Sequence, residues 1–245
     1  MPRHASFVTL LTFLQRRFPD LDNPVQLIKE GAVLVDGVPA ASTRTRVRAD
    51  ASIQIRRPRV LRGTIKLAHA LTGFDVDAAG AVALDLGAAA GGFTQALLEA
   101  GAARVYAVDV GVGQLRGWLR ADPRVINLER TNLADLGPRL IGEPVDLITM
   151  DLSYLSVAGA IDQLDRRMMA PGAQLLALVK PTFELRAATL AETPEQVAAA
   201  AAAGAAARAL ERHGWRIRGQ LPSAVRGAKG AIEVVLHASL EPAGP

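Results

Sequence analysis

The sequence has no cysteine, and that absence excludes several kinds of chemistry together. The chain cannot form a disulfide, use a thiolate nucleophile or hold zinc through sulfur, and we expect no metal site. Aromatic residues are also scarce, at 4% of the chain, although 50% of all residues are hydrophobic. A core of this composition must consist mainly of Ala, Val, Leu and Ile, which favours a layered α/β fold over an aromatic-rich β-sandwich.

Long apolar runs are missing as well. A membrane-spanning helix needs roughly 18 or more apolar residues, and the Ala-rich stretch Val197–Ala207 is shorter than that and flanked by charges. Arg16 and Arg17 follow the apolar run Phe7–Leu14 without the small-residue cleavage site of a signal peptide. The sequence therefore predicts a soluble, cytoplasmic protein with no membrane partner, and it leaves the oligomeric state open.

Lysine is rare, with four residues against 24 arginines. Arginine keeps its proton in proteins, whereas lysine can exist as a neutral amine, so a retained lysine is a candidate for chemistry. Positive charge is also uneven: residues 1–62 contain 11 Lys or Arg and 5 Asp or Glu, while residues 63–245 contain 17 and 19. This pattern is typical of an enzyme with an appendage that binds a polyanion, although a merely Arg-rich surface is the alternative.

Residues 1–58 have the pattern of a small α+β domain. Asp36-Gly37 is a tight hairpin signal, and Gly31 is a signal for the end of a helix. The elements expected are helices over Phe7–Arg17 and Val25–Glu30 and strands over Ala32–Val35 and Ser52–Arg56.

The string LIKEGAVLVDGVPAASTRTRVRADASIQI resembles the second half of the S-four-type RNA-binding domain, in which basic residues meet RNA phosphates. Phosphate contacts give affinity without sequence choice. On this resemblance the contacts fall to basic residues of the helix, the loop and the following linker: Lys29, Arg44, Arg46, Arg48, Arg56 and Arg57. Asp22-Asn23 stands where that family has a Ser-Arg helix start, so a small cap that does not bind RNA is the alternative.

A basic linker, residues 56–59, marks a domain boundary, and residues 59–245 alternate between strand and helix patterns. Such alternation is typical of an α/β fold with a mostly parallel sheet. Helices are expected over Thr64–Leu71 and from Thr193-Pro194-Glu195-Gln196 onward. Seven strands are expected, over Ala81–Leu86, Arg104–Asp109, Val125–Leu128, Val145–Asp151, Gln174–Val179, Trp215–Leu221 and Ile232–His237.

The segment LDLGAAAGGFT, residues 84–94, has the form of a strand, a glycine loop and a helix start. A dinucleotide fingerprint would place glycine at 87, 89 and 92, but Ala89 stands where a pyrophosphate must approach the backbone. S-adenosylmethionine has no phosphate, so the loop favours this cofactor over a nicotinamide dinucleotide or a purely structural loop. Asp109 ends the next strand, 22 residues after Gly87, and is placed to bond the ribose hydroxyls of a nucleoside.

Four ordered strings, LDLGAAAGGFTQALLEAGAARVYAVDVGVGQL, LERTNL, LITMDLSYLS and LVKPTFE, are together similar to the TlyA (hemolysin A) family of FtsJ-like ribosomal RNA ribose methyltransferases. The resemblance covers about residues 25–240. It implies a Rossmann-like class I methyltransferase fold with an N-terminal S-four-type domain, acting on RNA of a ribosomal subunit. It assigns the cofactor contacts to Asp85, Gly87, Ala88, Gly91, Gly92, Phe93, Asp109, Asn132 and Asp151.

The FtsJ-like group carries a Lys-Asp-Lys-Glu tetrad, whose matches here are Lys66, Asp151, Lys180 and Glu233. Asp151 and Lys180 each end an apolar strand, at the edge where open α/β sheets bind ligands. Glu233 interrupts an apolar strand and needs a cationic partner.

A ribose hydroxyl is a poor nucleophile at neutral pH, so methyl transfer to it gains from a base within hydrogen-bond reach. Lys180 is expected to act as that base, Asp151 to orient it, and Glu233 to hold Lys66 or the substrate hydroxyl. A plain ion pair between Lys180 and Asp151 is the alternative.

Several residues depart from the family pattern: Ala89-Ala90 replace Ser-Thr, Ala231 replaces Asn, and Thr64-Ile65 replace Gly-Leu. Polar contacts are lost while the tetrad stays complete. Three functions therefore remain open: a ribosomal RNA ribose methyltransferase, which the strings favour, a divergent methyltransferase of another RNA or a metabolite, and a non-catalytic RNA binder.

Overall fold

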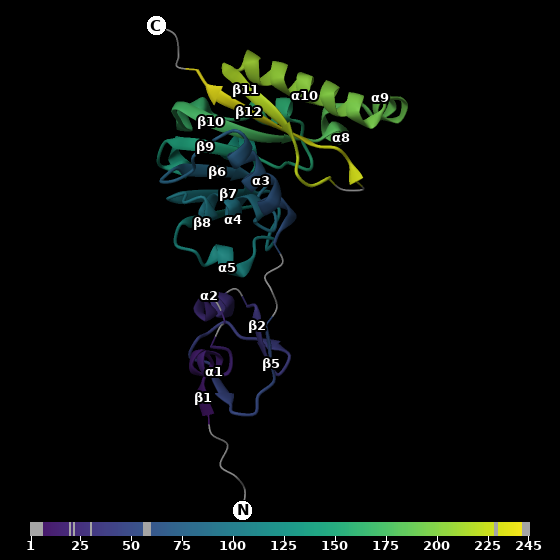
Figure 1. Ribbon diagram of the computed structural model, residues 1–245. Helices are drawn as coiled ribbons and strands as arrows, with labels where there is room; N and C mark the ends of the chain where they lie inside the picture. Colours follow the sequence, from purple (N-terminus) through teal and green to yellow (C-terminus); the bar gives the residue numbers. More distant parts are fainter. Residues whose placement is uncertain are drawn as a thin grey trace, which may run out of the picture. The chain divides into compact units, whose positions relative to one another are not determined.

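A computed structural model describes residues 7–19, 21, 23–29, 31–55, 60–227 and 230–241 (Figure 1). The chain forms two compact units, residues 1–59 (unit 1) and residues 60–245 (unit 2). Among the helices described in both units, none combines the length and the apolar character that a bilayer crossing requires.

Unit 1 is a small α+β unit around one hydrophobic cluster, in which Leu10, Leu14, Ile28 and Val33 have no exposed surface. Strand β2 pairs with β3 and β5 in one antiparallel sheet, and β1 pairs with β4 in another. The elements are β1 (Phe7–Thr9), α1 (Leu10–Arg17), α2 (Pro24–Lys29), β2 (Val33–Val35), β3 (Val38–Pro39), β4 (Arg46–Arg48) and β5 (Ile53–Ile55).

Local chemistry explains where these elements begin and turn. The helix expected from Phe7 begins only at Leu10, because the Thr9 side chain accepts the backbone N–H of Thr12 and so caps the first turn. The residues before it pair with β4, a strand that was not predicted. The Asp36-Gly37 hairpin prediction is confirmed: both residues have positive φ, +50° and +84°, as a type I′ turn requires.

Unit 2 contains one seven-stranded sheet in the order β11-β12-β10-β9-β6-β7-β8. Within this sheet β12 runs antiparallel to both of its neighbours, and the other strands are parallel to one another. This confirms the predicted seven-stranded, mostly parallel sheet. The strands are β6 (Val82–Leu86), β7 (Arg104–Asp109), β8 (Val125–Glu129), β9 (Val145–Met150), β10 (Met169–Val179), β11 (Trp215–Pro222) and β12 (Val234–Leu240).

Helices cover both faces of this sheet, so its strands are apolar on both sides. One face packs against α3, α4 and α5, and the other against α6, α7 and α10. The helices are α3 (Arg62–Gly73), α4 (Gly92–Glu99), α5 (Gly117–Arg120), α6 (Pro138–Ile141), α7 (Val157–Ile161), α8 (Pro181–Glu184), α9 (Ala187–Glu192) and α10 (Glu195–Arg212), with 3-10 turns at Leu133–Asp135 and Arg166–Met168.

The predicted Ala-rich helix is confirmed as α10, which lies alongside β11 in Figure 1. It begins at Glu195, directly after Pro194, as the start signal indicates. Its buried face consists largely of alanine: Ala198, Ala199, Ala202, Ala203, Ala206 and Ala209. Small side chains allow this helix to approach the sheet closely, and this explains how a core with few aromatic residues is filled.

Candidate active site

A cavity of about 720 Å³ opens at the carboxyl edge of the sheet in unit 2. Its walls come from the start of α3, the loop between β6 and α4, the ends of β9 and β10, and the loop before β12. The lining residues are Leu61, Arg62, Gly63, Lys66, Gly87, Ala88, Ala89, Ala90, Gly92, Phe93, Asp151, Ser153, Lys180, Pro181, Thr182, Phe183, Gly227, Ala231 and Glu233. All four residues of the predicted tetrad therefore face one space.

The glycine loop, residues 87–91, presents mainly backbone to this cavity. Gly87 has a φ of +86°, and a Cβ there would lie 2.7 Å from the backbone oxygen of Asp151. Only glycine allows the loop to pass so close to the end of β9. Gly91, with a φ of +96°, faces the core instead, because a Cβ there would meet Leu119 and Leu115. The loop is thus fixed by packing on one side and open on the other.

Asp109 anchors the glycine loop. One of its carboxylate oxygens accepts the N–H of Ala89 at 2.8 Å, and the other accepts the N–H of Gly111 at 2.7 Å. Asp109 is not among the residues that line the cavity. Each of its carboxylate oxygens could still accept a second hydrogen bond, for example from a ribose hydroxyl. Asn132 is exposed after β8, next to Thr131, whose N–H bonds the backbone oxygen of Asp109 at 3.2 Å.

Asp85 has a different place from the other predicted cofactor residues, because it is completely buried. Its two carboxylate oxygens accept the hydroxyls of Thr94, at 2.7 Å, and Thr149, at 3.0 Å. Burial raises the pKa of the Asp85 carboxyl to about 6, although these two hydrogen bonds oppose the shift. Asp85 therefore joins β6, β9 and α4 beneath the loop rather than lining the cavity.

Lys66 and Glu233, which both line the cavity, form a buried ion pair. Lys66 Nζ lies 2.5 Å from Glu233 Oε2, and the two side chains are only 8% and 5% exposed. Removing one partner of such a pair typically costs about 3–5 kcal/mol, because the other charge stays buried alone. The expected cationic partner of Glu233 is therefore Lys66.

The position of Glu233 corrects one prediction. Glu233 does not interrupt a strand: it lies one residue before β12, which begins at Val234. Because β12 is antiparallel, its first residue pairs with Val179, the last residue of β10. The start of β12 thus lies at the same edge of the sheet as the end of β10. Glu233 therefore reaches the site from before its strand, whereas Asp151 and Lys180 reach it from after theirs.

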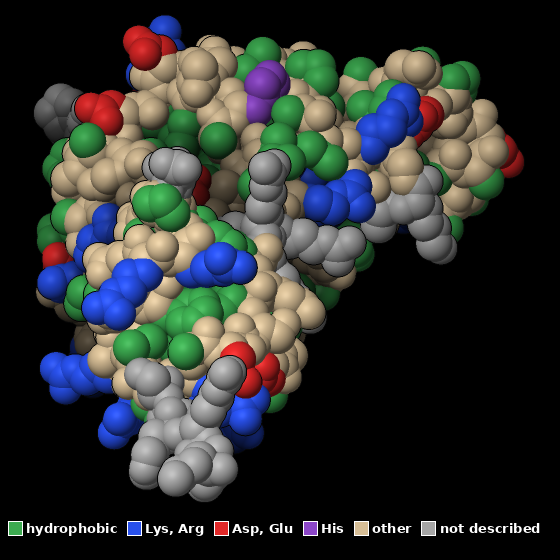
Figure 2. All heavy atoms as spheres, turned by 60° about the horizontal axis from the view of Figure 1, so that its bottom comes forward, with side chains coloured by type: hydrophobic (Ala, Val, Ile, Leu, Met, Phe, Trp, Pro, Cys, Tyr) green, Lys and Arg blue, Asp and Glu red, His purple; other side chains and the backbone are tan. Residues whose placement is uncertain are grey.

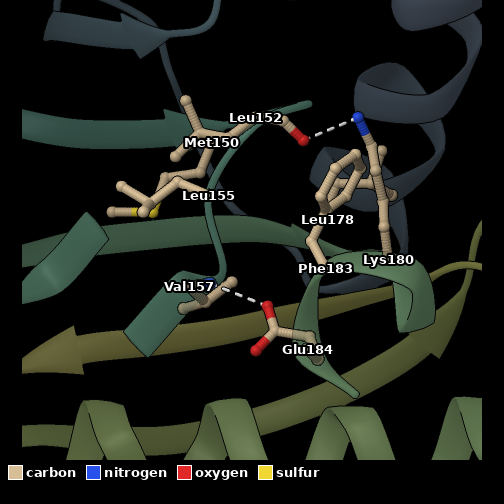
Figure 3. A pocket seen from close by; sticks show the side chains of 8 residues that line it. All are labelled: Met150, Leu152, Leu155, Val157, Leu178, Lys180, Phe183 and Glu184. Carbon is tan, nitrogen blue, oxygen red and sulfur yellow. Dashed lines mark hydrogen bonds between the residues drawn. The ribbon is translucent and has the colours of Figure 1, made fainter. Parts of the chain in front are cut away.

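Lys180 is held by three acceptors from the segment that follows β9. Its Nζ lies 2.6 Å from Asp151 Oδ1, 2.9 Å from the backbone oxygen of Leu152 and 3.0 Å from Ser153 Oγ. The bond to Leu152 and the Phe183 ring beside the lysine are drawn in Figure 3. Lys180 follows β10 and Asp151 follows β9, so the prediction that both end apolar strands is confirmed.

A second contact joins the same two segments. Glu184 accepts the N–H of Val157, the first residue of α7, at 2.7 Å, beside a small cavity of about 10 Å³ (Figure 3). Burial raises the pKa of the Glu184 carboxyl. Together with the Lys180 contacts, this bond fixes the segment after β10 against the segment after β9.

The loop between β11 and β12 (the 223–233 loop) is held by contacts from α3 and α10 to its described residues, 223–227 and 230–233. Glu195 accepts the N–H of Ile232 at 2.7 Å and pairs with Arg226 at 3.2 Å. Arg62, at the start of α3, donates to the backbone oxygen of Arg226. A Cβ on Gly227 would lie 2.1 Å from a carboxylate oxygen of Glu233, so the loop passes directly over this side chain.

Sequence patterns did not identify Ser153, Glu184, Arg62, Arg226 or Glu195 as parts of the site. Glu195 carries a helix-start signal, but nothing in the chain indicates that its carboxylate reaches Ile232, 37 residues away. Such contacts depend on how the loops fold and leave no periodic pattern.

The residues predicted to contact RNA divide into two groups. Lys29, Arg44, Arg46 and Arg48 are exposed on unit 1, whereas Arg56 and Arg57 lie outside the described residues. The Arg46 guanidinium lies over the Phe7 ring, 5.6 Å from its centre. Exposed Lys and Arg side chains are visible on the face drawn in Figure 2.

Comparison with known proteins gives a consistent result. The FtsJ-like methyltransferase family model matches residues 59–239. The chain is 39% identical over 218 residues, 86% of this chain and 81% of the relative, to the 16S/23S rRNA (cytidine-2'-O)-methyltransferase TlyA of Mycobacterium tuberculosis.

Two solved structures are similar to this one. A hemolysin-like protein from Lactococcus lactis has a TM-score of 0.69 at 28% identity, over 75% of this chain and 89% of that one. An S-adenosylmethionine-dependent methyltransferase from Listeria monocytogenes shares the fold, with a TM-score of 0.51 at 15% identity, over 74% and 99% of the two chains.

Proposed function

The chain belongs to the FtsJ-like methyltransferase family and is an S-adenosylmethionine-dependent methyltransferase, and from that premise we propose that it methylates a ribose 2'-hydroxyl of ribosomal RNA. The observation that carries the proposal is the pair of lysine–carboxylate contacts, Lys66–Glu233 and Lys180–Asp151, facing one cavity beside the glycine loop. The name of the Mycobacterium tuberculosis relative, a ribose methyltransferase of ribosomal RNA, supports it.

The cavity and its walls fit the cofactor. Its volume of about 720 Å³ lies within the roughly 300–1,000 Å³ that is usual for small-molecule sites. Gly87, Ala88, Gly92 and Phe93 line it, and they offer a close backbone surface with one aromatic side chain. We propose that Asp109 and Asn132, at the neighbouring strand ends, hold the nucleoside part, and that Asp85 and Gly91 support the loop from below.

S-adenosylmethionine supplies a methyl group on a sulfonium, which an oxygen nucleophile accepts. In the proposed mechanism Lys180 takes the proton of the ribose hydroxyl, and Asp151 holds Lys180 in place. Glu233 keeps Lys66 in the cavity wall, where the ammonium stabilises negative charge that develops on the attacking oxygen. The remaining gain comes from positioning, since the two loops that carry Asp151 and Lys180 are bonded to each other.

Unit 1 supplies RNA affinity in this proposal. Its exposed basic residues, among them Arg44, Arg46 and Arg48, would contact phosphates, as expected for an S-four-type RNA-binding domain. Phosphate contacts would hold a structured RNA while unit 2 selects the hydroxyl that is methylated.

The proposal is tested by transfer of labelled methyl from S-adenosylmethionine to purified ribosomal subunits. Labelled RNA should then be hydrolysed with alkali, because a 2'-O-methyl group blocks attack on the adjacent phosphate and leaves an alkali-resistant dinucleotide. Label recovered in such dinucleotides supports the proposal. Label recovered only on bases contradicts it.

A second candidate is methylation of a metabolite, which the alanines lining the cavity favour. Ala89, Ala90 and Ala231 offer no polar group where the family usually has Ser, Thr and Asn. A small-molecule extract should be labelled in parallel with the ribosomal subunits. Label that enters only the extract would support this second candidate in place of the first.

A further inference from the structure

The Lys180 ammonium has a complete set of hydrogen-bond partners. An ammonium carries three N–H donors, and Asp151 Oδ1, the Leu152 oxygen and Ser153 Oγ lie 2.6, 2.9 and 3.0 Å from Nζ. The Phe183 ring lies beside the side chain, with its centre 6.0 Å from Nζ (Figure 3). A substrate hydroxyl therefore finds no unused direction at this nitrogen.

A lysine that accepts a proton must first be a neutral amine, with two N–H donors and one lone pair. The Asp151 carboxylate and the Leu152 carbonyl can only accept hydrogen bonds, so they take the two N–H donors. The Ser153 hydroxyl can donate as well as accept. The lone pair of neutral Lys180 is thus directed at Ser153.

Ser153 is also the most exposed of the three partners of Lys180. It is exposed and lines the cavity, while the Lys180 side chain is 13% exposed. A substrate hydroxyl that enters the cavity can therefore meet Ser153 Oγ, which lies 3.0 Å from Lys180 Nζ.

We propose that Ser153 relays the proton from the acceptor hydroxyl to Lys180, an inference that rests on the proposed function. The acceptor oxygen forms its bond to the methyl carbon as the carbon–sulfur bond breaks and leaves a neutral thioether. The acceptor proton moves to Ser153 Oγ, and the Ser153 proton moves to the Lys180 lone pair. Ser153 ends as a neutral hydroxyl and Lys180 as an ammonium, so charge and atoms balance.

The test compares three variants in single-turnover methyl transfer to ribosomal subunits. Ser153→Ala removes the relay, Ser153→Thr keeps a hydroxyl, and Ser156→Ala is the matched control. Ser156 lies in the same segment, but its hydroxyl caps α7 by accepting the N–H of Gly159 at 3.0 Å. Each rate is measured from pH 6 to 9, with RNA affinity and melting temperature measured alongside.

Ser153→Ala should lose at least about 10-fold in rate, a modest part of what proton transfer usually contributes, with RNA affinity unchanged. Its rate should also lose any rise with pH that the wild-type rate shows, because the proton no longer passes from Ser153 to Lys180. Ser153→Thr should recover most of the rate and that rise, and Ser156→Ala should stay within about 3-fold of wild type.

Two outcomes overturn the relay. A Ser153→Ala rate within about 3-fold of wild type means that the hydroxyl reaches Lys180 directly. A slower variant whose rate still rises with pH as the wild type does means that Ser153 only supports the loop. Neither affects the proposed function, which fails separately if the wild-type protein leaves ribosomal RNA without ribose methylation.

Discussion

Lys180 is the residue whose chemistry a single substitution can isolate. Lys180→Arg keeps a positive charge near Asp151 but removes the neutral amine, since a guanidinium does not lose its proton in proteins. We expect methyl transfer to fall about 10²-fold or more, while affinity for S-adenosylmethionine, measured by calorimetry, stays within a few-fold. A variant that retains more than about a tenth of the wild-type rate would show that Lys180 acts by charge alone.

Asp85 gives a residue-scale prediction about stability. Burial raises the pKa of its carboxyl from 3.8 to about 6, so the folded state binds this proton more tightly than the unfolded state. Its contribution is fully present below about pH 4 and is lost as the pH rises through about 6. At about 1.4 kcal/mol per unit, the loss is about 3 kcal/mol.

Asp85→Asn removes this titration, and its amide can still bond the hydroxyls of Thr94 and Thr149. The free energy of unfolding of the wild type, relative to Asp85→Asn, should therefore decrease between about pH 4 and 6 and stay level above about pH 7. Urea denaturation of both proteins across this range measures the difference. Parallel stability curves would mean that Asp85 titrates normally in the folded protein.

At the scale of elements, the 223–233 loop controls the Lys66–Glu233 pair. A Cβ on Gly227 would lie 2.1 Å from the Glu233 carboxylate, so Gly227→Ala must push this group away from Lys66. We expect methyl transfer to fall at least 10-fold and the melting temperature to drop by several degrees, because a buried pair is broken.

Gly117→Ala is the control for this variant. Gly117 begins α5, its φ is not positive, and no atom lies within 4 Å of an added Cβ. It should leave both activity and melting temperature close to wild type. Equal losses in the two variants would contradict a specific role for the loop.

Some of these elements could be predicted from the sequence and others could not. Asp151 and Lys180 were predictable because buried parallel strands are apolar runs that end at one edge of the sheet. Glu233 was misplaced because the apolar run begins at Ile232, whereas β12 begins only at Val234. The backbone N–H of Ile232 donates to the Glu195 carboxylate and not to a neighbouring strand. The pairing of β1 with β4 was missed because each strand has only three residues.

The site contacts beyond the tetrad were harder to predict. Asp85 and Asp109 occupy similar positions near strand ends. Asp85 is completely buried and accepts the Thr94 hydroxyl, whereas Asp109 accepts two backbone N–H groups of the neighbouring loops. Lys180 is held in part by the Leu152 carbonyl, a group that every residue carries. Contacts to backbone depend on loop geometry, so residue type does not indicate them.

For the whole molecule, charge position rather than total charge should govern RNA binding. Arg44, Arg46 and Arg48 of unit 1 are exposed, and replacing all three with Gln should weaken ribosomal RNA binding. Each lost phosphate contact should also reduce the slope of log affinity against log salt by about 0.7–0.9. Filter binding at several salt concentrations measures both quantities.

A control with the same change in net charge comes from unit 2. Arg139, Arg208 and Arg212 are also exposed, and their replacement with Gln should leave affinity and slope nearly unchanged. If both triple variants lose equally, total charge accounts for RNA binding and unit 1 has no special part in it.

The order of the strands has a consequence for how the enzyme folds during its synthesis. β12 follows β10 and β11 in the chain, but it lies between them in the sheet. A ribosome releasing this protein therefore exposes β11 before the strand that connects it to the rest of the sheet has been made. A nascent chain at that stage already contains the glycine loop, Asp151 and Lys180, but Glu233, the partner of Lys66, has not yet been synthesised. The last described strand of the sheet and the Lys66–Glu233 pair can form only after β11 has been made, so in the proposed mechanism the site is complete only once β12 has joined the sheet.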